Sequence, residues 1–155
     1  MREYKHCLFL IVLLLSLTGC DKKNPTELHR VHWDRDMCER CKMVVSDRQH
    51  ATQVINTENG RSYMFDDIGC AVLWFDEEKI AWASKAKIWV TDITTGKWID
   101  ARIALYDTNN ITSMAFGFGA HDGNTTIKEG EETVDFAEVK KRIFEIEANQ
   151  NRKAY

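Results

Sequence analysis

Hydrophobic and polar positions follow two periods along the chain, and together they predict strands followed by a helix. Residues 51–56 and 61–65 are rich in β-branched and aromatic side chains, and the Asn-Gly pair between them is a strong hairpin signal. A helix is expected next, from Ile68 to Ala83, because apolar residues recur on one face. One of the two aspartates just before it can cap its first turn.

The same order of strands and helix is predicted again in the second half. Strands are expected at residues 87–91, 97–101 and 103–106. The apolar run over 112–119 is interrupted by glycines and fits either a buried strand or a loop of a binding site. A last helix should begin after Asp135, which opens a capping-box pattern followed by apolar residues at helical spacing.

These elements predict a single small α+β domain over residues 32–148, made of two ββαβ-type halves. A chain of 155 residues is long enough for one domain with its own core. Residues 149–155 are expected to fray as a tail.

The N-terminal residues 1–19 have the pattern of a lipoprotein export signal. The apolar run Leu8 to Leu17 follows two basic residues and spans ten residues, whereas a membrane-spanning helix needs about 20. Leu17-Thr18-Gly19-Cys20 resembles the bacterial lipobox, so Cys20 is expected to carry the lipid; an ordinary secretory signal cleaved nearby is the alternative. Residues 20–31 are then the anchor and a polar tether, and Asp21 favours the inner membrane.

The charge of the chain argues against one class of partner. The formal net charge is −3, and no basic run is present outside the signal. Nucleic-acid binding depends on clustered Lys and Arg, so no nucleic-acid partner is expected.

Three cysteines remain for the folded domain once the signal is removed and Cys20 is lipidated: Cys38, Cys41 and Cys70. An odd number of thiols outside the cytoplasm indicates either one disulfide with a free thiol, or thiols reserved for a metal. Cys70 is expected in the first turn of a helix, where a small buried structural role is favoured.

The sequence Cys38-Glu39-Arg40-Cys41-Lys42-Met43 gathers three sulfur side chains within six residues. Thiol and thioether sulfur are soft ligands that suit Cu(I) better than harder cations. Residues 43–45 are expected to form a short strand, and on a strand beginning at Cys41, Cys41 and Met43 would point to the same face. The candidate Cu(I) ligands are therefore Cys41 and Met43, with Met114 and Cys38 as further donors.

Other interpretations of these residues stay open. Cys38 and Cys41 could form a short-range structural disulfide, and Met114 could be ordinary core filler. A thioredoxin-like redox pair lacks its usual helical context, and a structural zinc site lacks a second Cys/His pair. Asp66 and Asp67 are better explained as helix caps than as a catalytic acid pair.

Five motifs in one order resemble the NosL family, the copper lipoproteins that accompany nitrous-oxide reductase. They follow the lipobox: Cys38-x-x-Cys41-x-Met43, Phe65-Asp66-Asp67-Ile68-Gly69-Cys70, Trp89-Val90-Thr91-Asp92, Trp98-Ile99-Asp100-Ala101 and the segment around Met114. The family usually has Cys-Gly-Met where this chain has Lys42 in place of glycine, and Pro-Met-Gly-Tyr-Gly where this chain has Ser-Met-Ala-Phe-Gly.

The resemblance implies a fold and a role. The fold would be similar in topology to part of organomercurial lyase. The role would be that of a non-catalytic metallochaperone on the periplasmic face of the membrane, delivering Cu(I) to apo-nitrous-oxide reductase in denitrification together with the Nos ABC-type membrane complex. The alternatives are a chaperone for a different periplasmic copper enzyme, a thiol–disulfide oxidoreductase acting through Cys38 and Cys41, or a scaffolding lipoprotein with a structural disulfide.

Overall fold

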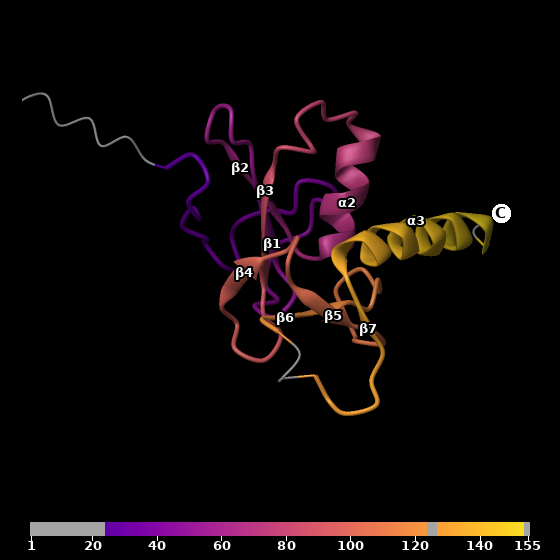
Figure 1. Ribbon diagram of the computed structural model, residues 1–155. Coiled ribbons are helices and arrows are strands. Elements are labelled where there is room, and N and C mark those ends of the chain that lie inside the picture. The colour runs from indigo at the N-terminus through magenta and orange to yellow at the C-terminus, as the bar shows by residue number, and fades with distance from the viewer. Residues whose placement is uncertain (1–23, 124–126, 154–155) are drawn as a thin grey trace, which may run out of the picture.

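Two antiparallel sheets and two helices build the fold in the computed structural model, which describes residues 24–123 and 127–153 (Figure 1). The four-stranded sheet has the order β2-β1-β3-β4, and the three-stranded sheet has the order β6-β5-β7. The expected α+β class is therefore confirmed.

The first sheet contains β1 (Thr52–Ile55), β2 (Ser62–Phe65), β3 (Lys87–Thr91) and β4 (Trp98–Asp100). β1 pairs with β2 through the predicted hairpin, with Thr52 opposite Phe65. Helix α2 (Ile68–Glu77) follows β2, and β3 then returns to pair with the other side of β1. The first half thus has the expected ββαβ order.

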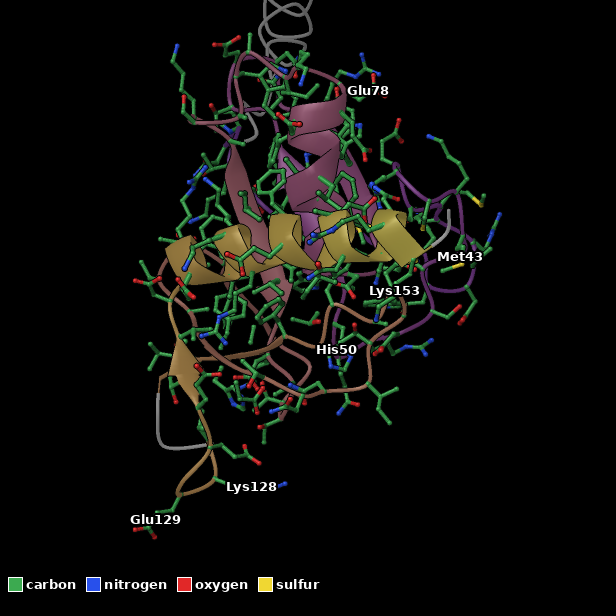
Figure 2. All side chains as sticks on the ribbon, turned by 90° about the vertical axis from the view of Figure 1, so that its right-hand side faces the viewer. Met43, His50, Glu78, Lys128, Glu129 and Lys153 are labelled. Carbon is green, nitrogen blue, oxygen red and sulfur yellow. The ribbon has the colours of Figure 1, made fainter. Side chains whose placement is uncertain are left out.

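The second sheet contains β5 (Leu105–Asp107), β6 (Gly119–His121) and β7 (Thr133–Val134), and helix α3 (Phe136–Lys153) comes after all three. The α3 N-terminus has the predicted cap, because the Glu138 N–H donates to Asp135 Oδ1 at 2.9 Å. Phe136, Val139 and Ile143 form its buried face. Helix α3 packs across α2, as Figure 2 shows.

Helix α2 ends six residues before the predicted end at Ala83. Lys79 adopts a left-handed conformation with a φ of 49°, which an α-helix cannot continue through. The Ile80 N–H donates to the Phe75 carbonyl at 3.0 Å and the Lys79 N–H to Asp76 at 3.2 Å. These two bonds form a Schellman cap, which satisfies the last carbonyls and turns the chain away.

Both ends of the described chain have contacts that the sequence did not predict. α3 remains helical to Lys153, where a frayed tail was expected from residue 149; Arg152 in its last turn donates to the Ala148 carbonyl and complements the helix dipole. The expected tether to residue 31 is fastened to the sheet, because the Trp89 indole donates to the Thr26 carbonyl at 3.1 Å and His29 exchanges hydrogen bonds with Gln53.

Residues 1–19 and Cys20, to which the export signal and the lipid are assigned, lie outside the described residues. Within residues 24–123 and 127–153, neither helix has the length and apolar character needed to cross a bilayer.

Candidate metal centre

Three thiols and one carboxylate converge beside the N-terminus of α2. The sulfur atoms of Cys38, Cys41 and Cys70 and a carboxylate oxygen of Asp66 all lie within 4.8 Å of one another. Cys38 and Cys41 come from the loop before β1, Asp66 directly follows β2, and Cys70 lies in the first turn of α2. The cluster therefore depends on tertiary packing of three separate segments.

The Cys38–Met43 loop is closed by its own backbone. The Cys38 N–H donates to the Met43 carbonyl at 2.8 Å, and the Lys42 N–H donates to the Cys38 carbonyl at 3.0 Å. Lys42 has a φ of 60°, in the left-handed region that favours glycine. The expected strand over residues 43–45 is wrong: only an isolated bridge between Met37 and Val44 forms, because the turn at Lys42 redirects the backbone.

Met43 therefore cannot share a strand face with Cys41, as the sequence interpretation supposed. The left-handed turn at Lys42 lies between the two residues, so no strand contains both of them. Cys38 is fully buried, whereas Met43 is 43% exposed. Figure 2 shows Met43 at the edge of the molecule, on the side toward which Lys153 and the end of α3 point.

Cys70 is placed by the cap of α2. Asp67 is the N-cap: it is extended, its Oδ1 accepts from the Gly69 N–H at 2.8 Å, and its carbonyl accepts from the Cys70 N–H at 3.1 Å. Cys70 is fully buried, as its residue type suggested, and it is also a member of the cluster.

The segment around Met114 is a loop that packs on the same end of α2. Thr112 Oγ1 donates to Asp67 Oδ2 at 2.6 Å, and the Met114 backbone also hydrogen-bonds to the Asp67 carboxylate. A Cβ atom at Gly69 would lie 2.1 Å from the Phe116 ring, so glycine is required for this contact. Of the two interpretations of this segment, the loop holds for residues 112–118, and the partly buried Met114 side chain packs against the core.

Asp66 is the member of the cluster that lacks a full set of partners. It is 1% exposed, and its Oδ1 accepts from the Cys41 thiol at 3.5 Å. Its Oδ2 is buried and has no hydrogen-bond partner among the described residues. A buried carboxylate oxygen without a partner is costly in a protein interior, and a bound cation removes that cost.

The environment moves the pKa values of the three thiols in different directions. A hydrogen bond from Cys70 lowers the pKa of Cys38 to about 6, although burial opposes the shift. Burial raises the pKa of Cys41 to about 12. The pKa of Cys70 is raised, because its proton is held in the hydrogen bond to Cys38 and the side chain is buried. Cys38 is therefore the thiol best prepared to meet a metal as thiolate at neutral pH.

The donor set fits a metal ion: three soft sulfurs with one carboxylate oxygen, close enough together to surround one ion. The structure thus brings together Cys38 and Cys41 from the predicted ligands. It adds Cys70 and Asp66, to which sequence reasoning gave structural roles. The signal for both was present, since a cap motif directly after a strand places its first-turn residues near the strand end.

No protein-family model matches the chain, and no curated protein shows significant similarity to it.

Proposed function

We propose that this protein is a non-catalytic Cu(I) metallochaperone, anchored in the membrane at Cys20 on the periplasmic side, that delivers copper for the maturation of nitrous-oxide reductase. The observation that carries the proposal is the convergence of three thiol sulfurs within 4.8 Å. Cu(I) accepts two to four soft donors, and thiolates select it over harder cations. The lipobox at Cys20 and the five NosL-like motifs support the location, the recipient enzyme and the Nos ABC-type membrane complex as partners.

The exposure of the cluster suits a carrier better than a storage site. Cys38 and Cys70 are fully buried, but Cys41 is only partly buried. Binding of Cu⁺ to the Cys38 thiolate and to the thiols of Cys41 and Cys70 would release two protons and form three Cu–S bonds. A ligand of the recipient can then replace Cys41 first, because a partner can reach this sulfur, while the two buried sulfurs keep the ion from water.

Ligand substitution tests the site directly. We expect Cys70→Ser to weaken Cu(I) binding at least tenfold, equivalent to about 1.4 kcal/mol, in an anaerobic competition titration against a chromophoric Cu(I) chelator. Ala71→Ser is the matched control, since it buries the same hydroxyl one residue further along α2 without removing a sulfur. Equal Cu(I) affinity of Cys70→Ser and the parent would refute a three-thiol centre.

Substitutions of the two methionines test whether the ligands predicted from the sequence bind Cu(I) in addition to the three thiols. Met43→Leu and Met114→Leu conserve size and apolarity, so any large loss of Cu(I) affinity reports the missing sulfur. Met43 is exposed beside the cluster, so its loss should matter for transfer between proteins more than for affinity. A tenfold loss of affinity in either variant would show that a thioether is a ligand.

Transfer and anchoring test the rest of the proposal. The reduced, Cu(I)-loaded protein should activate apo-nitrous-oxide reductase faster than a Cu(I) buffer that sets the same concentration of free Cu(I). Cys20→Ser should leave the protein unprocessed or released from membranes, as seen by fractionation. Transfer no faster than buffered Cu(I) would refute the chaperone role for this recipient and point to another periplasmic copper enzyme.

A zinc site is the second candidate, and one observation favours it. Asp66 contributes a carboxylate oxygen, a ligand that Zn²⁺ accepts readily and Cu(I) avoids. A Cys₃Asp set would hold Zn²⁺ in a closed tetrahedral site with a structural role. Zn²⁺ that displaces equimolar Cu(I) from the reduced protein would favour this function over the copper chaperone.

A further inference from the structure

Arg40 lies inside the Cys38–Cys41 loop and contacts both α2 and α3. Its Nε donates to the Glu77 carboxylate at 2.9 Å and its Nη2 donates to the same carboxylate at 2.8 Å. Nη2 also lies 3.0 Å from Glu147 Oε1. Glu77 is the last residue of α2 and Glu147 belongs to α3, so one side chain links the loop to both helices.

The geometry of the cluster depends on where this loop sits relative to α2. Cys38 and Cys41 belong to the loop, but Cys70 belongs to the helix. The backbone fastens the loop to β2 through the Glu39 N–H, which donates to the Met64 carbonyl at 2.8 Å. Arg40 supplies a side-chain link to α2 itself, and a guanidinium held by two parallel hydrogen bonds is fixed in orientation as well as distance.

We propose that Arg40 is a positioning residue of the metal centre, and that its clamp on Glu77 and Glu147 holds the Cys38–Cys41 loop against α2. With the loop clamped, the sulfurs of the loop and of the helix are already within 4.8 Å of each other before a metal arrives. Without the clamp, a metal must first order the loop, and this entropic cost is taken from the binding free energy. The inference deepens the proposed function, on which it rests for its cargo.

A purely electrostatic role makes the opposite prediction for one variant. Three thiolates around Cu⁺ carry two net negative charges, so nearby carboxylates oppose binding. Removing the Glu77 carboxylate would then strengthen metal binding. If Arg40 instead positions the loop, Glu77→Ala should weaken metal binding, because it frees the guanidinium from α2. The sign of this single change therefore separates positioning from charge.

The experiment measures metal affinity of the full chain with two probes, Cu(I) and Cd²⁺, in the parent and in Arg40→Met, Arg40→Lys, Glu77→Ala and Arg142→Met. Arg142→Met is the matched control, because Arg142 also joins two glutamates, Glu132 at 2.6 Å and Glu138 at 2.9 Å. Arg142 lies outside the Cys38–Cys41 loop. Urea unfolding of each variant checks that it is folded.

We expect Arg40→Met to lower the affinity for both metals about tenfold, and Glu77→Ala to lower it about threefold. Arg142→Met should leave both affinities unchanged. Arg40→Lys should restore little, since lysine keeps the charge but cannot form the fork. The thiolate-to-Cd²⁺ charge-transfer absorption per bound ion should fall in Arg40→Met, because fewer sulfurs reach the metal together.

Parent-like affinity in Arg40→Met, or tighter binding in Glu77→Ala, would overturn the positioning role. If the parent binds Cd²⁺ but not Cu(I), the proposed copper function fails, and the Cd²⁺ measurements still decide the role of Arg40. If the parent binds neither metal, both proposals are overturned. If Arg40→Met is unfolded, Glu77→Ala decides, since it breaks the same clamp from the exposed end of α2.

Discussion

Asp66 and Asp67 are neighbours in the chain and equally buried, at 1% exposed each, yet their carboxylates are used differently. Asp67 accepts hydrogen bonds from Gly69, Thr112 and the Met114 backbone, which join the α2 cap to the 112–118 loop. Asp66 receives one long contact from Cys41, and its second oxygen has no partner within the described part of the chain. The comparison separates a carboxylate that holds the fold from one that is available to a ligand.

The largest effect should come from Asp67→Ala in the metal-free protein. This change removes the cap of α2 and leaves the Thr112 hydroxyl and two backbone N–H groups without their acceptor in a buried site. We expect a loss of about 3 kcal/mol in the free energy of unfolding, measured by urea denaturation. Asp66→Ala is the matched control and should cost far less, since it removes a buried carboxylate that is poorly satisfied. An equal loss of unfolding free energy in the two variants would show that both carboxylates stabilise the fold to the same extent.

The next effect concerns the metal. If Asp66 is a ligand, Asp66→Ala should weaken Zn²⁺ binding about tenfold but change Cu(I) binding by less than about threefold, because Cu(I) depends on sulfur. Parallel titrations of the same variant with the two ions measure this ratio. A larger loss for Cu(I) than for Zn²⁺ would contradict the assignment of the three thiols as the principal Cu(I) ligands.

Local features of the chain could be predicted because they depend on nearby residues. The β1–β2 hairpin, the aspartate cap of α2 and the capping box of α3 each involve contacts within a few residues. The metal cluster could be predicted only in part: Cys38 and Cys41 are close in the sequence, but Cys70 meets them only after the loop packs on α2. Residue type argued for a structural Cys70, because buried cysteines are usually inert. The strand expected at residues 43–45 failed because nothing in a lysine side chain indicates a left-handed backbone at Lys42.

Asp92 extends the comparison to a third buried carboxylate, and like Asp67 it accepts several hydrogen bonds. Burial alone would raise its pKa, but hydrogen bonds from Asp122, Thr95 and Thr94 together lower it below the usual value. A depressed folded-state pKa means that the stabilisation is complete above the unfolded value of about 3.9 and is lost as the pH falls through the folded value. We expect Asp92→Asn to cost about 1 kcal/mol at pH 7.

The pH dependence of that cost is the check. Urea unfolding of Asp92→Asn and of the parent should differ at pH 7 and converge as the pH falls below about 3.9. A difference that stays constant down to acidic pH would mean that the charge of Asp92 contributes nothing.

The smallest effect should come from Lys42→Gly. A non-glycine residue in the left-handed region costs about 1 kcal/mol, and glycine removes that cost, although the variant loses the contacts of Lys42 with Glu39. We expect a net stabilisation below about 1 kcal/mol by urea unfolding. Lys79→Gly is the matched control, since Lys79 also has a left-handed backbone, with a φ of 49° after the end of α2. It lies outside the Cys38–Cys41 loop. Destabilisation by Lys42→Gly alone would show that the lysine contacts matter more than its backbone.

The hydrogen bonds of Thr26 and His29 have a mechanical consequence. A pull on the chain from its N-terminal side would first load the bonds to Trp89 on β3 and Gln53 on β1, the two central strands of the first sheet. These hydrogen bonds come before Cys38 in the chain. The sheet therefore bears the force, and the Cys38–Cys41 loop bears none. A force applied to the chain before Thr26 would therefore leave the spacing of the three sulfurs unchanged.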